Sequence, residues 1–218
     1  MKLRIGLVFC LLTAMKFSAV AGTAGREDKD TLVVINTRFG EITVLLFRET
    51  PVHRANFLRL TANGSYDSTT FHRIIKDFMI QGGDPNSKDA DPVNDGMGTY
   101  GQTLPAEFDT AFTHIQGALA AAWTSNPEKR SSDCQFYLVE NPKGTHFLDR
   151  NYTVFGQTLE GIEVIQAIAS QPKGAANKPE ANIRMWMKIL PMKKEKITET
   201  YGWDYASRRI RPEQIKNK

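Results

Sequence analysis

Cysteine is scarce in this sequence of 218 residues, which contains only Cys10 and Cys134. We expect Cys10 to leave with an N-terminal signal, so Cys134 has no partner for an internal disulfide and the fold must be stabilised by its core. Long apolar runs are also missing, because the run 5–15 ends at Lys16 and is shorter than the about 20 residues of a spanning helix. With 41% hydrophobic and 24% charged residues, the chain is neither disordered nor a collagen, a coiled coil or a multi-span membrane protein.

The N-terminus has the pattern of a secretory signal. Lys2 and Arg4 precede the apolar run, and Ala19-Val20-Ala21 supplies the small residues of a cleavage site. We therefore expect cleavage after Ala21 and an exported, periplasmic protein, with residues 22–30 as a short linker. An amphipathic or buried N-terminal helix is the alternative. Lipoprotein anchoring through Cys10 is not expected, because bulky Phe9 precedes it.

Charge of one sign is not in excess in the mature chain. Removing residues 1–21 takes away three basic and no acidic residues, which lowers the net charge from +4 to +1. A local basic excess lies in residues 192–218, with eight Lys or Arg and four Asp or Glu. We expect a basic C-terminal extension, 191–218, in which residues 201–205 pack back on the core and Arg208 to Lys218 trail in solvent. We expect a monomer with neither nucleic acid nor membrane as a partner.

From residue 31 onward, short apolar segments alternate with turn residues. A helix is predicted over 51–62, where Thr50 would be the N-cap before Pro51, and a second over 161–170. Many strands with two helices and no βαβ alternation predict one mainly β domain over 31–190, an antiparallel sandwich or barrel. The candidate strands are 32–36, 42–47, 71–75, 78–81, 104–108, 118–122, 135–139, 153–158 and 183–190.

Two motifs suggest ligands only superficially. Residues 96–101 (GMGTYG) match a dinucleotide fingerprint, but a polar stretch precedes them and Pro105 follows soon after, so we expect a flexible glycine loop. A solvated acidic loop is expected from Asp84, Asp89, Asp91 and Asp95, because the central Gly and final Glu of a calcium loop are missing. The four histidines lack metal-ligand spacing, so no metal is expected.

The segment 71–84 (FHRIIKDFMIQGGD) carries the strongest signal. It predicts two strands about a Lys-Asp turn, with Phe71, Arg73 and Ile75 on one face of the first, and Met79 and Gln81 together on the second. An arginine that alternates with apolar residues is unusual, although an edge-strand arginine in solvent would explain it too.

This segment resembles the cyclophilin family of peptidyl-prolyl cis-trans isomerases, and in particular its exported bacterial members. Further matching segments follow in family order over roughly residues 31–190: 56–57 (NF), 117–122 (GALAAA), 135–137 (QFY), 147–149 (FLD) and 152–156 (YTVFG). The resemblance implies a closed eight-stranded antiparallel β-barrel capped by two α-helices, with its site on the outer face. Alternation agrees, since Gln135 and Tyr137 share one face and Cys134, Phe136 and Leu138 the other, which makes Cys134 a buried, inert thiol.

The resemblance implies Arg73 as the catalytic residue and Gln81 as the neighbour that holds the substrate backbone. No cofactor is implied, and the substrates are proline-containing polypeptides. The implied substrate-binding residues are Phe78, Met79, Ala122, Trp123, Thr124, Gln135, Tyr137, Phe147, Leu148 and Tyr152. Alternation alone does not place Phe78 beside Met79 in one pocket.

Three positions depart from the family pattern. Tyr137 stands where phenylalanine is common and adds a hydroxyl to the pocket, and Phe147 stands where a tryptophan favours cyclosporin, so weak cyclosporin binding is expected. Trp123 stands where Asn or Arg is common, and it could either narrow the groove or pack on a neighbouring loop. The alternative function is a non-catalytic module or chaperone that holds proline segments in the same groove. Arg73 favours the enzyme, because binding alone does not need it.

Overall fold

The computed structural model describes residues 28–123 and 126–211. The predicted signal peptide, Cys10 and Thr124 lie outside these residues. No helix in the described part of the chain has the length and apolar character needed to cross a membrane.

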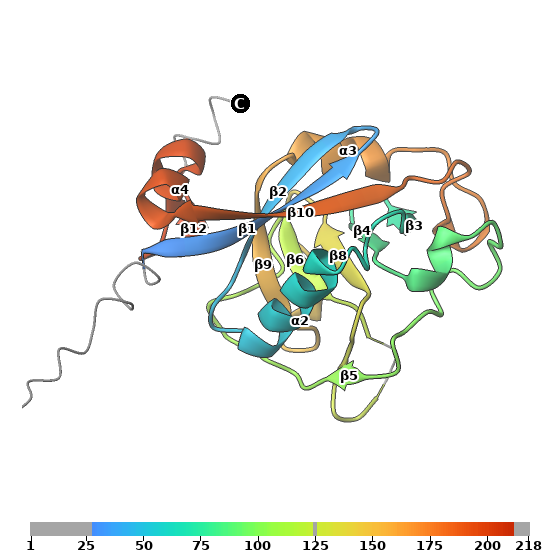
Figure 1. Ribbon diagram of the computed structural model, residues 1–218, viewed down its shortest axis with the longest axis horizontal. Coiled ribbons are helices and arrows are strands. Elements are labelled where there is room, and N and C mark those ends of the chain that lie inside the picture. Colours follow the sequence, from blue (N-terminus) through green and yellow to red (C-terminus); the bar gives the residue numbers. More distant parts are fainter. Residues whose placement is uncertain (1–27, 124–125, 212–218) are drawn as a thin grey trace, which may run out of the picture.

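Eight strands form one antiparallel sheet in the order β10-β1-β2-β9-β6-β8-β4-β3 (Figure 1). The sheet curls until its edge strands meet at a single bridge between Thr70 and Arg184. It is therefore a barrel that is open along most of this seam, and the expected full closure is wrong in that respect. The strands are β1 (Lys29–Thr37), β2 (Gly40–Leu46), β3 (Phe71–Ile75), β4 (Met79–Gly82), β6 (Ala118–Ala121), β8 (Phe136–Val139), β9 (Val154–Glu160) and β10 (Met185–Lys193).

The strand predicted over 104–108 is wrong. Only β5 (Thr103–Leu104) is extended there, and it pairs with β7 (Ser131–Ser132) outside the main sheet. Glu107 instead turns its carboxylate to the first turn of α2 (Pro51–Ala62), where its two oxygens each accept a backbone N–H, from Val52 and from His53, at 2.9 Å. Thr50 occupies the N-cap position as predicted, but its side chain makes no capping hydrogen bond.

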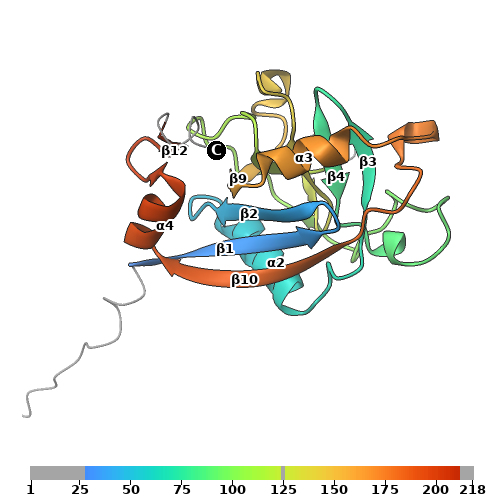
Figure 2. The ribbon, with the colours of Figure 1, turned by 90° about the horizontal axis from the view of Figure 1, so that it is seen from above.

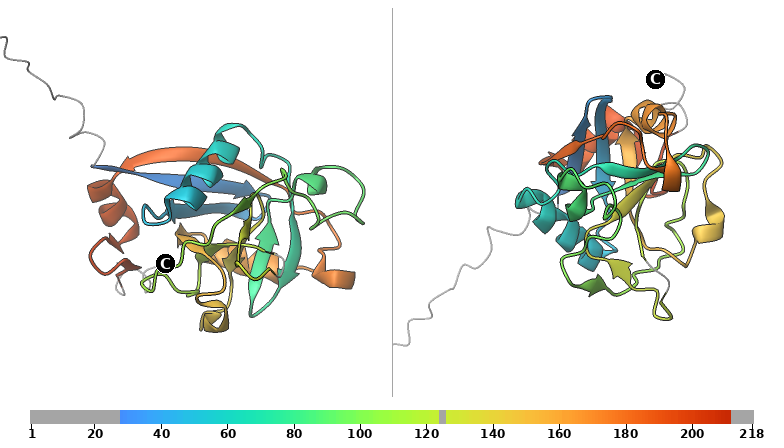
Figure 3. Two further views of the ribbon diagram at one scale, coloured as in Figure 1. Left: turned by 90° about the horizontal axis from the view of Figure 1, so that it is seen from below. Right: turned by 90° about the vertical axis from the view of Figure 1, so that its right-hand side faces the viewer.

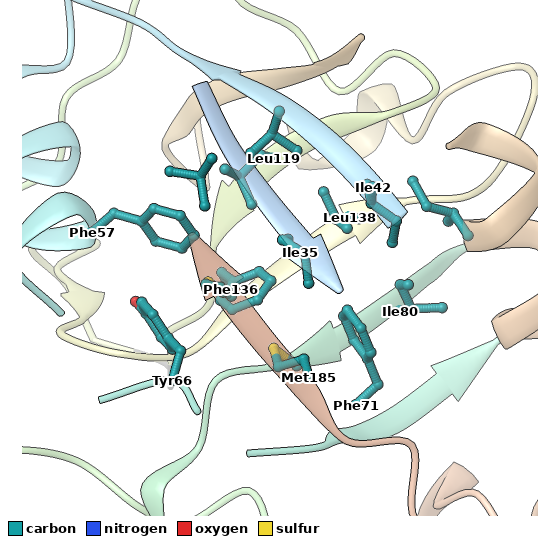
Figure 4. Packing of buried hydrophobic residues seen from close by; sticks show 14 of the residues in the cluster. Ile35, Ile42, Phe57, Tyr66, Phe71, Ile80, Leu119, Phe136, Leu138 and Met185 are labelled. Carbon is teal, nitrogen blue, oxygen red and sulfur yellow. The ribbon is translucent and has the colours of Figure 1, made fainter. Parts of the chain in front are cut away.

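The interior of the curled sheet holds a continuous apolar core (Figure 4). Helix α2 contributes Phe57 and Leu60, and α3 (Ile162–Ala169) contributes Ile165 and Ile168, all nearly inaccessible to solvent. Side chains fill the interior, and the outer face stays the predicted place of the site. Cys134 lies in this core, and burial raises the pKa of its thiol to about 12, which agrees with the inert role predicted for it.

The C-terminal extension folds back onto the outer face of the sheet. It comprises α4 (Lys194–Tyr201), β11 (Trp203–Asp204) and β12 (Arg209–Ile210), and Figure 2 shows α4 at the end of β10 where β1 begins. Ile197, Tyr201 and Trp203 are buried, as the sequence predicted for the aromatic residues. The expectation that Arg208 lies free in solvent is wrong, because its side chain pairs with Glu49 at 2.9 Å and with Asp109 at 3.6 Å.

The acidic loop after β4 is organised around one carboxylate. Asp84 is fully buried and accepts backbone N–H groups from Asn86, Gly96 and Gly98, while Asp95 pairs with Lys178. The short helix η1 (Pro85–Lys88) lies beside β3 (Figure 3). The Ser87 hydroxyl accepts the N–H of Thr70, the residue before β3, at 2.9 Å. The expectation of a solvated acidic loop is therefore wrong for Asp84 and Asp95, whereas Asp89 and Asp91 are exposed. The flexibility expected of the glycine loop stays a prediction.

Replacing Asp84 with asparagine should lower the free energy of unfolding by about 1–3 kcal/mol, because the new amide NH₂ would face backbone N–H groups that need an acceptor. Chemical denaturation measures the change. The matched control is Asp91→Asn in the same loop, which should stay within about 0.5 kcal/mol of wild type. Equal effects of the two substitutions would contradict the assigned role of Asp84.

Candidate active site on the outer face

A bulge in β3 decides where Arg73 lies. The register shifts between Phe71, which pairs with Gly82, and Arg73, which pairs with Gln81. Phe71 therefore enters the interior core, while Arg73 and Ile75 lie on the outer face, so the prediction that all three share one face is wrong for Phe71. Although β3 is an edge strand, Arg73 is half-buried and hydrogen-bonded, which argues against a merely solvated edge arginine.

Three polar side chains form a row: Arg73 on β3, Gln81 on β4 and Gln135 directly before β8. Arg73 Nη1 donates to Gln81 Oε1 at 3.2 Å, and Gln81 Nε2 donates to Gln135 Oε1 at 3.1 Å. Gln135 Nε2 in turn donates to the carbonyl oxygens of Gly96 and Gly98 at 2.9 and 3.0 Å. The glycine loop thus anchors a chain of amides that ends at the guanidinium. Burial lowers the pKa of Arg73 and the nearby Tyr152 raises it, yet an arginine stays charged at neutral pH.

Beside this row lies an apolar cluster on the outer face. Met79 and Tyr137 are almost completely buried in the outer-face cluster, and the half-buried Phe78 and Leu148 pack against it. Phe78 lies in the turn before β4 begins, where Asp77 has a φ of 59° and the Phe78 carbonyl accepts the N–H of Glu140 at 2.9 Å. Because Phe78 precedes the strand, its side chain need not follow the alternation of β4. It packs against the same outer-face cluster as Met79.

Aromatic rings pack around this apolar cluster. Phe147, which is 70% exposed, stacks on Phe78 with ring centroids 5.7 Å apart. On another side Trp123 packs against Tyr152 at 5.2 Å, and Tyr152 meets Tyr137 edge-on at 5.9 Å. Trp123 therefore packs on a neighbouring turn, and the residue it packs on is itself a predicted part of the rim. Ala122 is buried in the same outer-face cluster.

The structure also gives roles that the sequence did not predict. His114 bonds to the Tyr137 hydroxyl and to Asp149, and the carbonyl groups of Gly96 and Gly98 hold Gln135. For His114 the sequence predicted only that it binds no metal. No local signal could have paired it with Asp149, because the contact joins residues that are 35 positions apart.

These features together indicate a class of protein. A charged donor fixed beside an apolar cluster, on the outside of a filled barrel, suits a protein that holds a small apolar ring of a peptide and acts electrostatically on the neighbouring amide bond.

The chain belongs to the cyclophilin-type peptidyl-prolyl cis-trans isomerase family, whose model matches residues 32–188. It is 33% identical over 156 residues to the peptidyl-prolyl cis-trans isomerase-like 1 protein of Neurospora crassa, covering 71% of this chain and 91% of that protein. A Cryptosporidium parvum cyclophilin type peptidyl-prolyl cis-trans isomerase, solved in the presence of the dipeptide Ala-Pro, aligns with a TM-score of 0.63 and 30% identity over 75% of this chain and 99% of that one. The predicted family, mainly β fold and enzyme class are thus confirmed.

A longer relative has a second activity in its name. A Streptococcus pyogenes protein named as a bifunctional phosphatase and peptidyl-prolyl cis-trans isomerase is 34% identical over 179 residues. The match covers 69% of this chain but only 37% of that protein, so the phosphatase part of the name does not transfer.

Proposed function

We propose that this cyclophilin-type isomerase accelerates the rotation of X-Pro bonds in exported polypeptides, with Arg73 as its catalytic residue and Gln81 as the holder of the substrate backbone. The observation that carries the proposal is the half-buried guanidinium of Arg73, fixed by Gln81 and next to the apolar pocket. The proline ring would occupy the pocket formed by Phe78, Met79, Tyr137 and Leu148.

The reaction needs no bond to break, and its difficulty is electronic. Resonance opposes rotation about a peptide bond with a barrier of about 18–20 kcal/mol, and uncatalysed X-Pro exchange takes tens to hundreds of seconds. In the twisted state conjugation is lost, and the prolyl nitrogen carries a localised lone pair. A guanidinium N–H of Arg73 can donate to that lone pair, which stabilises the twisted state over the planar one.

The reduction of the activation barrier that catalysis requires is within the reach of this site. A turnover of about 10³ per second corresponds to a barrier near 13 kcal/mol, so the protein has to supply about 5–7 kcal/mol. One charged donor in a site from which the substrate excludes water can provide part of this effect. Positioning can provide the rest, because Phe78 and Met79 would hold the proline ring while Gln81 restrains the flanking carbonyl.

Exchange spectroscopy by NMR tests the activity directly. We expect the purified protein to accelerate cis-trans exchange of an Ala-Pro peptide at catalytic concentration. Binding of the peptide without faster exchange would make the groove a docking site, which is the non-catalytic alternative. Since Phe147 replaces the tryptophan that favours cyclosporin in the family, we also expect weak inhibition by that compound.

Export is a separate part of the proposal and has a separate test. Expression of the full chain in a Gram-negative bacterium should give a periplasmic product whose intact mass corresponds to a start at Gly22, because the signal pattern ends at Ala21. Replacing Ala19 and Ala21 with leucine should block the cleavage. A cytoplasmic product that retains residues 1–21 would refute export without affecting the isomerase.

A further inference from the structure

A hydrogen-bonded chain runs from the wall of the pocket to a surface turn. The Tyr137 hydroxyl on β8 lies 2.9 Å from His114 Nε2, and His114 Nδ1 lies 2.7 Å from Asp149 Oδ1. Asp149 follows the short helix η2 (His146–Leu148), and its other oxygen lies 3.0 Å from His146 Nδ1. Tyr137 and His114 are both almost completely buried, so neither can exchange these partners for bulk water.

The geometry fixes the direction of each hydrogen bond. A carboxylate only accepts, so His114 donates its Nδ1–H to Asp149, and the neutral ring then has a bare Nε2 that can only accept. The Tyr137 O–H therefore donates to Nε2. Its hydrogen is therefore directed at His114 and away from the proposed proline pocket, to which Tyr137 would present only its ring.

Protonation of His114 would reverse the last of these bonds. Nε2–H would become a donor, and the tyrosine hydrogen would lose its acceptor inside a buried, apolar site, where an unsatisfied hydroxyl is costly. The hydroxyl could then be satisfied only if its hydrogen turned toward the pocket or if the ring moved. Either change is unfavourable for the bound proline.

We propose that Asp149 and His114 are positioning residues that act through Tyr137, and that proline binding requires the neutral form of His114. This inference rests on the proposed function, because it assumes that the proline ring occupies the pocket beside Tyr137. The same carboxylate also accepts the backbone N–H of His114 at 2.8 Å, so it ties the turn that carries Phe147 and Leu148 to the segment behind Tyr137.

The electrostatic surroundings agree with a neutral ring. Burial lowers the pKa of His114 below its ordinary value of 6.5, and this outweighs the opposite effect of Asp149. Burial alone would raise the pKa of Asp149, but hydrogen bonds from His114 and His146 outweigh it and lower the pKa, so the carboxylate is charged. The titratable side chains facing the chain are Asp149 and His146 from η2 and its cap, and Tyr152, whose ring meets Tyr137.

The test measures binding of an Ala-Pro peptide by NMR titration between pH 7.5 and pH 5. In the wild type the Kd should rise by about 2- to 10-fold as the pH falls, which corresponds to one buried hydrogen bond. Tyr137→Phe should lose this pH response, because it has no hydroxyl that can bond to His114. His114→Gln keeps an acceptor but cannot be protonated, so it should also bind without a pH response.

A double substitution distinguishes positioning from a general structural role. His114→Leu leaves the hydroxyl without a hydrogen-bond partner and should raise the Kd by about 2- to 10-fold at every pH, whereas the same substitution made in a Tyr137→Phe background should leave the Kd of that background unchanged. The matched control is His53→Gln, because His53 is another buried histidine bonded to a carboxylate, Glu107 at 2.6 Å, away from the pocket. It should leave both the Kd and its pH response unchanged.

Several results would overturn the proposal. A pH response that disappears in His146→Gln would belong to that exposed ring, and a His114→Leu defect that persists in the Tyr137→Phe background would be structural. Imidazole ¹⁵N shifts of the free protein that place the neutral proton on Nε2 would refute the assigned direction without any peptide. Arg73→Ala should keep the pH response of binding, so a failure of catalysis and a failure of the positioning chain are distinguishable. Absence of peptide binding at every pH would refute both.

Discussion

Replacing Arg73 with alanine is expected to lower catalysed exchange of an Ala-Pro peptide by about 100- to 1000-fold, while peptide binding changes much less. The reason is that the guanidinium acts on the twisted state, in which the prolyl nitrogen has its lone pair, and removal of one preorganised charged donor from an active site has effects of this size. Exchange NMR at saturating peptide separates the rate from the Kd.

Two comparisons make the result specific to the site. Arg73→Lys keeps a charge but not the planar fork that bonds to Gln81, and should recover only part of the activity. Arg38→Ala removes an exposed arginine that stacks on Phe39 and should leave catalysis unchanged. Full activity in a stably folded Arg73→Ala variant would refute the catalytic assignment.

Replacing Trp203 with alanine should lower the free energy of unfolding by about 3–5 kcal/mol, the range typical of a buried aromatic residue. Trp203 is 2% exposed, and its ring lies 6.1 Å from Phe47 and 6.4 Å from Tyr205. The loss would open a cavity between the C-terminal extension and the sheet. Chemical denaturation, monitored by far-UV circular dichroism, measures it.

Trp186→Ala is the matched control, because Trp186 belongs to β10 but is 46% exposed. It should change stability by about 0.5 kcal/mol or less. A Trp203→Ala variant as stable as this control would mean that the extension is an appendage and does not contribute to the core.

The regular elements followed from patterns that are local in the sequence. Alternating apolar residues and turn signals predicted most strands, and Pro51 marked the start of the first expected helix. The failures have non-local causes. The bulge beside Arg73 depends on how β3 pairs with β4. Glu107 lies outside the strand expected for it, and its carboxylate accepts the first N–H groups of the distant helix α2.

For the site, the sequence predicted the residues of the outer face but not the residues that hold them in place. The family resemblance named Arg73 and the aromatic rim, and most of these residues lie together on one face, although their roles remain predictions. Residues that act behind the surface were not predicted. His114 meets Asp149 only after the sheet forms, and Asp84 resembled a solvated residue because the sequence does not show that three backbone N–H groups surround it.

The pairing of β1 with β10 has a consequence for how the chain folds. Lys29 lies opposite Lys193, and the N–H of Lys194 donates to the carbonyl of Asp28 at 2.9 Å, so strands from opposite ends of the described chain are neighbours. Pairing of distant segments requires loop-closure entropy and slows folding. During synthesis β1 keeps one edge unpaired until nearly the whole domain has emerged, and an unpaired edge invites association with other chains. The time of greatest risk of aggregation for this protein therefore lasts until β10 is made.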